Sequence, residues 1–112
     1  MSVPVMTVII AAKYCETAQT TQYTSTGATT KVDMFTATNV SASSVTFSVH
    51  IVESGGSASA ANKIVSSQEV LPGSAYIADE MCHNINPGAF ISTTCSASNS
   101  LVIYASGREV AE

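Results

Sequence analysis

Four side chains capable of chemistry crowd into one short segment, Asp79–His83, which reads DEMCH. Two carboxylates, a thiol and an imidazole are the groups that bind metal ions or supply an acid, a base and a nucleophile. On an extended chain, however, adjacent side chains point to opposite faces, so Cys82 and His83 would not face one ligand together. We therefore expect the segment to end a strand. Met81 or Cys82 would be buried there, and the two acids and His83 would lie in solvent.

A metal or catalytic site at this segment would need help from distant residues, namely Cys15, His50 or Cys95. A catalytic thiol requires a base held opposite it, and nothing in the spacing of these residues brings one to Cys82. The chain also has no G-x-S-x-G elbow and no glycine-rich phosphate loop. We predict that the protein is not an enzyme and has no catalytic residue, metal ion, cofactor or small-molecule substrate.

The charge balance limits the partners that the surface can attract. Only 11% of the 112 residues are charged and the net charge is −4. The cations are Lys13, Lys31, Lys63 and Arg108. Four scattered cations cannot form a basic patch, so we expect no binding to nucleic acid or to an anionic membrane. A surface poor in charge is suited to contact with another protein.

Short strand patterns recur along the whole chain. The clearest is at 45–53, where Val45, Phe47, Val49 and Ile51 alternate with Thr46, Ser48 and His50. Further strands are predicted at 19–25, 30–39, 63–71, 74–80, 89–97 and 101–107, and the first twelve residues also read as a strand. Residues 39–44 form a small-residue turn of hairpin length. This pattern predicts an all-β chain: a single small β-sandwich or jelly roll of about 7–8 antiparallel strands over 1–112, with little or no helix.

Aromatic residues with a polar end are the natural candidates for contact with a partner. Tyrosine is enriched at protein interfaces because its ring is apolar and its hydroxyl is polar, although it is also an ordinary residue at the edge of a core. His50, alone on the polar face of its strand, is expected to be solvated or hydrogen-bonded. The interface candidates are Val3, Val5, Tyr14, Tyr23, Tyr76, Tyr104, Arg108 and Val110.

Several turn motifs follow one another along the chain. They are an early Thr/Tyr segment (AAKYCETAQTTQYT), an F-x-A-x-N-x-S turn leading into VT-x-SV, a first Pro-Gly turn, a PG-x-x-I-S segment and an ASG-x-E ending. In this order they resemble the small decoration, or stapling, proteins on the outer capsid of short-tailed bacteriophages of the epsilon-fifteen kind. The resemblance implies a β-rich jelly roll that holds neighbouring major capsid protein subunits together, with no catalytic residue.

The resemblance also implies a location. The protein would be made in the host cytoplasm and would end on the outer surface of the capsid. We expect a homodimer there, because two-fold self-pairing is the commonest symmetric arrangement. Its ends, 1–12 and 107–112, would be extended arms that add strands to a neighbour, or would pair within their own sandwich. The start, MSVPVMTVIIAA, has no positive region typical of a targeting signal, so we expect reduced, buried thiols. If oxidation follows in the particle, the expected pair is Cys82 with Cys95.

A second interpretation is a module of the phage neck or tail that binds another virion protein or a host-surface carbohydrate. Carbohydrate binding would favour aromatic residues in exposed loops. The segments 54–62 and 96–100 contain none, which favours the capsid.

Overall fold

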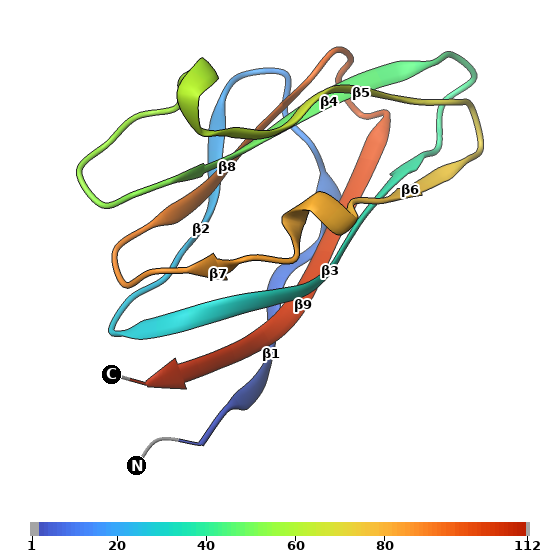
Figure 1. Ribbon diagram of the computed structural model, residues 1–112. Coiled ribbons are helices and arrows are strands. Elements are labelled where there is room, and N and C mark those ends of the chain that lie inside the picture. The colour runs from blue at the N-terminus through green and yellow to red at the C-terminus, as the bar shows by residue number, and fades with distance from the viewer. Residues whose placement is uncertain (1–2, 112) are drawn as a thin grey trace.

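A computed structural model describes residues 3–111 of the chain, and these residues form nine strands in two antiparallel sheets (Figure 1). The outermost residues of the two expected arms, positions 1–2 and 112, lie outside the described range. The strands are β1 (Val5–Tyr14), β2 (Thr20–Thr24), β3 (Ala28–Asn39), β4 (Val45–Val52), β5 (Lys63–Val70), β6 (Ala75–Ile77), β7 (Asn84–Ile85), β8 (Phe90–Cys95) and β9 (Leu101–Ala111). Two 3-10 turns, η1 (Ala60–Asn62) and η2 (Asp79–Met81), complete the described elements.

The strand order is that of a jelly roll. One sheet runs β1-β9-β3-β6, with the two-residue β7 also paired to β3, and the other runs β2-β8-β4-β5. Successive strands mostly cross from one sheet to the other, which is the double Greek-key arrangement of this fold. The predicted all-β sandwich is confirmed. The strand number exceeds the expected 7–8 because the short segments β6 and β7 pair separately with β3.

The turn at residues 39–44 is not a hairpin, because β3 and β4 lie in different sheets. Asn39 organises this crossing from a fully buried position. Its Nδ2 donates to the carbonyl oxygens of Ser43 and Val70, at 2.7 and 2.9 Å. Its Oδ1 accepts from the amide and the hydroxyl of Ser41. The sequence of a short polar loop therefore does not show whether the two flanking strands pair as a hairpin or lie in different sheets.

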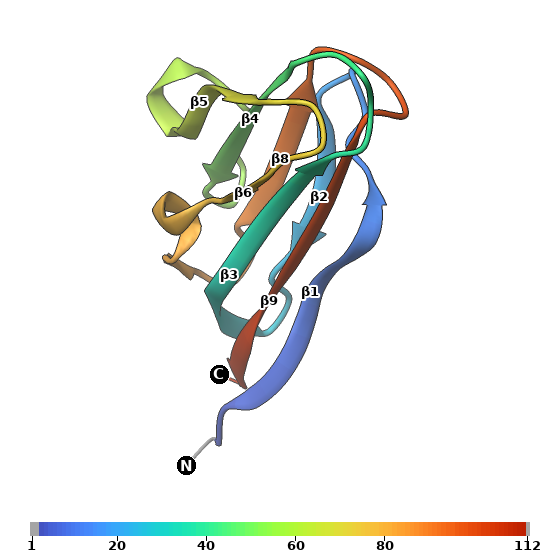
Figure 2. The ribbon, with the colours of Figure 1, turned by 90° about the vertical axis from the view of Figure 1, so that its right-hand side faces the viewer.

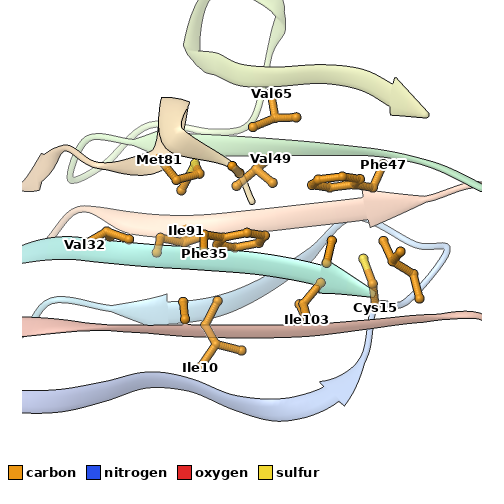
Figure 3. Close-up of a cluster of buried hydrophobic side chains, with 14 of the residues drawn as sticks. Ile10, Cys15, Val32, Phe35, Phe47, Val49, Val65, Met81, Ile91 and Ile103 are labelled. Carbon is orange, nitrogen blue, oxygen red and sulfur yellow. The ribbon is translucent and has the colours of Figure 1, made fainter. Parts of the chain in front are cut away.

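The core lies between the two sheets (Figure 3). Phe35 from β3 stacks on Phe47 from β4, with ring centroids 6.3 Å apart, and Tyr76 meets Phe47 edge-on. These three rings join the sheets at the centre of the sandwich, where aromatic packing contributes beyond its buried area.

Strand β4 departs from its predicted alternation in its second half. Ser48, His50 and Val52 are buried, whereas Ile51 is half-buried. Register shifts in the pairing of β4 with β5 disturb the strict alternation here. His50 is satisfied by Asn62 of η1, whose Oδ1 lies 2.9 Å from the His50 Nδ1. His50 is therefore hydrogen-bonded, as expected, but inside the fold.

Both ends of the described chain pair inside the five-stranded sheet. Strand β1 is antiparallel to β9, and β9 also pairs with β3, so β9 is flanked on both sides over residues 107–109. The two ends emerge at the same end of the sandwich in both views (Figures 1 and 2). Strand β1 is the outer strand of the sheet, and none of the strands described within residues 3–111 pairs with its second edge. Within residues 3–111, neither helical turn has the length or apolar character needed to cross a membrane.

Candidate interaction surface

The exposed large apolar side chains of the described strands all belong to the five-stranded sheet. The four-stranded sheet carries none on its strands, and the other exposed ones, Val3, Val40 and Leu71, lie outside the strands. We call the outward-facing set on the five-stranded sheet the apolar face. Its members are Met6, Val8, Tyr14, Met34, Ile77, Val102 and Tyr104.

The register of the sheet gathers these residues from four strands. In β9, Leu101, Ile103 and Ala105 point into the core, so Val102 and Tyr104 point outward. Cross-strand partners of β9 then share its outer face. Val8 and Met34 flank Ser106, Tyr14 and Thr38 flank Val102, and Thr36 lies between Tyr104 and Ile77.

A β-bulge in β3 shapes one end of the apolar face. Gly107 pairs with Val32 and Ser106 with Met34, which leaves Asp33 as the extra residue. The bulge exposes Asp33 and Met34 side by side. An open groove of about 290 Å³ lies here, lined by Met6, Thr7, Val8, Asp33, Ser106 and Gly107.

Arg108 closes this end of the face with an ion pair. Its Nε and Nη2 donate to the two carboxylate oxygens of Asp33, at 3.0 and 2.9 Å. Both side chains remain about two-fifths exposed. The guanidinium holds the pKa of the Asp33 carboxyl below its usual range. Charge is thus paired at the rim, and the rest of the face carries apolar side chains with the uncharged Thr36, Thr38 and Ser106 among them.

The predicted interface residues divide into three groups. Tyr14 and Tyr104 lie on the apolar face, and Arg108 lies at its rim. Val3 and Val5 are exposed at the start of the chain. The structure thus brings Tyr14, Tyr104 and Arg108 together on one sheet.

The remaining predicted residues, Tyr23, Tyr76 and Val110, are partly buried. The Tyr23 hydroxyl bonds to Thr30, at 2.7 Å, and to the Glu109 carboxylate, and burial raises the pKa of this tyrosine. The Tyr76 hydroxyl donates to Glu80 at 2.8 Å. These two tyrosines use their polar ends within the fold and hold elements together.

Met6, Val8, Met34 and Ile77 are the exposed members of the face that the sequence interpretation missed. The alternation of β9 could have identified them, because the residues that pair with its outward-facing positions also face outward. Using it requires the strand pairing, and pairing is not visible in one sequence.

The DEMCH segment forms η2 and the residues after it, instead of ending a strand. Met81 is fully buried, and Asp79, Glu80 and His83 are exposed, as expected. Cys82 donates to the carbonyl oxygen of Asp33 at 3.3 Å. Across residues 3–111, no three His, Cys, Asp or Glu side chains gather in a group suited to a metal ion.

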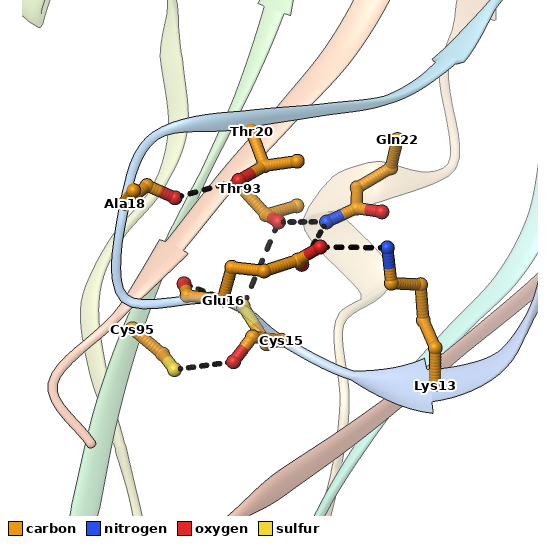
Figure 4. Close-up of polar contacts among 8 residues, drawn as sticks. All are labelled: Lys13, Cys15, Glu16, Ala18, Thr20, Gln22, Thr93 and Cys95. Carbon is orange, nitrogen blue, oxygen red and sulfur yellow. Dashed lines mark hydrogen bonds and ion pairs between the residues drawn. The ribbon is translucent and has the colours of Figure 1, made fainter. Parts of the chain in front are cut away.

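A second cluster surrounds Cys15, at the end of β1 (Figure 4). Its thiol donates to the Thr93 hydroxyl at 3.5 Å, and Gln22 links Thr93 to Glu16. Lys13 pairs with Glu16 at 2.9 Å, and hydrogen bonds from Lys13 and Gln22 lower the pKa of that carboxyl. Burial raises the pKa of Cys15 to about 12. The thiol is therefore protonated at neutral pH and is a poor nucleophile.

Comparison with known proteins leaves the family open. No family model and no curated protein matches the chain. Among solved structures, a chain from the structure of infectious bursal disease virus, Gx strain, matches with a TM-score of 0.46 and 10% identity. The match covers 98% of this chain but 31% of that one, so the present chain spans about a third of its length. This distant likeness to part of a viral chain is too weak to carry an argument about function.

Proposed function

We propose that the protein is a structural component of a virus particle, a decoration protein that binds the outside of a phage capsid and staples neighbouring major capsid protein subunits. The observation that carries the proposal is the segregation of exposed apolar side chains onto the outer face of one sheet. The order of the turn motifs resembles that of phage decoration proteins, and we take the capsid as the partner from this resemblance.

The apolar face has the composition of a protein contact. Methionine, tyrosine and aliphatic side chains lie on it together with the uncharged side chains of β3 and β9, and the paired charges of Arg108 and Asp33 lie at its rim. Interfaces are typically arranged in this way, with charge depleted at the core and polar groups around it. An isolated contact of this size can be weak. Many copies on one lattice would together restrain the subunits beneath them.

The free edge of β1 suits pairing with a second copy of the chain. No charged side chain occurs between Val5 and Ala12 of β1. The lysine and the proline that usually block strand addition lie only near the two ends of the strand, at Lys13 and Pro4. Antiparallel pairing of β1 with its own copy satisfies a two-fold axis. The two apolar faces would then belong to one continuous sheet, with twice the contact area.

Sedimentation tests the function. Purified protein is mixed with capsids of the same phage that lack it, and bound copies are counted by gel densitometry. Hundreds of copies per particle, together with slower capsid disruption on heating, support the decoration role. A few copies per particle would contradict it and would favour a module of the neck or tail.

The oligomeric state is measured separately, by sedimentation velocity over a range of protein concentrations. We expect a dimer that Val5→Lys dissociates by placing charge on the β1 edge. The matched control is Val40→Lys, which adds the same charge to an exposed valine outside the strands. A monomer at all concentrations, or equal effects of the two changes, would contradict pairing through β1.

A further inference from the structure

The two most buried cysteines of the chain lie against each other, although 80 residues separate them. Cys15 follows the last residue of β1 and Cys95 is the last residue of β8, so they come from different sheets. The Cys95 amide donates to the Glu16 carbonyl oxygen at 3.1 Å, which brings the two backbones together. The Cys95 thiol donates to the carbonyl oxygen of Cys15 at 3.0 Å.

Burial is the largest cause of the raised pKa of Cys15, and the nearby Cys95 side chain raises it further. Figure 4 shows both side chains in the same polar cluster at the end of β1. All three cysteines are free thiols in this structure.

Cys82 lies elsewhere. Its thiol donates to the Asp33 carbonyl oxygen at the bulge of β3, whereas the Cys95 thiol contacts the carbonyl oxygens of Cys15 and Ala97. The pair that the sequence analysis expected if oxidation occurs in the particle, Cys82 with Cys95, is therefore not the one that this geometry favours.

We propose that Cys15 and Cys95 form a disulfide when the protein meets a disulfide oxidant such as glutathione disulfide. One thiolate attacks the oxidant and releases a glutathione thiolate, which leaves a mixed disulfide on the protein. The second cysteine thiolate then attacks that mixed disulfide and expels the other glutathione thiolate. Two cysteine thiols are oxidised, one glutathione disulfide is reduced to two glutathiones, and the two cysteine protons end on them.

The bond would join the two sheets at one end of the sandwich. It would close a loop of about 80 residues, and long loops restrict the unfolded chain strongly. We expect the melting temperature to rise by roughly 10 °C. Because both thiols are buried, the folded protein should oxidise slowly, whereas refolding in a glutathione buffer gives the oxidant free access to both.

The test compares reduced protein with protein that has been unfolded and then refolded in a buffer of reduced and oxidised glutathione. Thiols are counted under denaturing conditions, and linked peptides are identified by mass spectrometry without reduction. We expect the count to fall from three thiols to one. The linked peptides should carry residues 15 and 95, and dithiothreitol should reverse the rise in melting temperature.

Two variants make the result specific. Cys82→Ser should still form the bond and show the same rise in melting temperature. Cys95→Ser should keep its remaining thiols free and show no rise in melting temperature. A refolded wild type that retains three thiols would overturn the proposal, and so would a bond that includes Cys82. A Cys15–Cys95 bond that leaves the melting temperature unchanged would overturn its stabilising role.

Discussion

Gly107 in β9 packs directly against the backbone of Lys31 in β3. A β-carbon on Gly107 would lie 1.9 Å from the Lys31 carbonyl oxygen, which is closer than any real contact allows. The approach occurs beside the bulge that exposes Asp33 and Met34. The glycine is therefore needed for strand contact, and it helps to shape the groove of the apolar face.

Gly107→Ala should consequently force the two strands apart. We expect a loss of about 3 kcal/mol in the free energy of unfolding, measured by urea denaturation. Ser106→Ala, in the same strand but pointing outward, is the control and should change stability by less than about 0.5 kcal/mol. Equal stabilities of the two variants would show that the close approach does not exist in solution.

Asn39→Ala should destabilise the crossing between the sheets. The change removes a side chain that makes four hydrogen bonds and leaves the buried Val70 carbonyl oxygen without its Asn39 donor. We expect a loss of about 2–4 kcal/mol by chemical denaturation, since unsatisfied buried groups are costly. Ser41→Ala removes the hydroxyl that donates to Asn39 and contacts Ser43, but it leaves the other three hydrogen bonds of Asn39 in place and should cost less. A loss below about 0.5 kcal/mol for Asn39→Ala would contradict the role of Asn39 at the crossing.

Alkaline solution should destabilise the reduced protein through Cys15. Its pKa is raised to about 12 in the folded state, so the unfolded chain loses this proton first as the pH rises. The stabilising contribution is therefore complete below the unfolded pKa and is lost from about pH 9 upward. The raised pKa of Tyr23 acts with the same sign at higher pH. Thermal melts in reducing buffer measure the effect.

A matched pair of cysteine variants isolates this contribution. Cys15→Ala should show a weaker decline in melting temperature between about pH 8 and pH 11 than the wild type does. Cys82→Ala should decline as the wild type does. Parallel declines in all three proteins would refute the contribution of the buried thiol.

Acid should lower the free energy of unfolding by protonating the two carboxylates that form ion pairs, those of Asp33 and Glu16. The pKa values of Asp33 and Glu16 are lowered, chiefly by hydrogen bonds from Arg108 and Lys13. Their contributions are present above the unfolded pKa and are lost as the pH falls, over about pH 5 to pH 3 and below. Asp33→Asn should reduce the difference in unfolding free energy between pH 7 and pH 3. Asp79→Asn, outside both ion pairs, should leave it nearly unchanged.

Strand positions were predictable because alternation is local. The pattern at 45–53 located β4, and Gly and Pro turns bounded its neighbours. Sheet assignment was not predictable, as the turn at 39–44 shows, because a crossing and a hairpin use the same residue types. The contact between Cys15 and Cys95 depends on that assignment and was hidden for the same reason.

The apolar face was only partly predictable from the residues. Tyr14 and Tyr104 were named from residue type alone, and they lie on it. Met34 was missed because the bulge at Asp33 turns it outward, whereas strict alternation along 30–39 would place it on the same face as the buried Val32. Bulges arise from the pairing between strands, so they cannot be predicted from the sequence of one strand.

The most direct measurement compares two variants with equal chemistry at different places. Ile77→Ser changes the apolar face, and Leu71→Ser changes a loop residue of similar exposure, 57% against 52% for Ile77. Each protein is titrated onto capsids that lack it, and bound copies are counted after sedimentation. The account predicts at least about tenfold weaker binding for Ile77→Ser and unchanged binding for Leu71→Ser, with both variants folded. Full binding by Ile77→Ser, or equal loss in both, would contradict the claim that the apolar face attaches the protein to its partner.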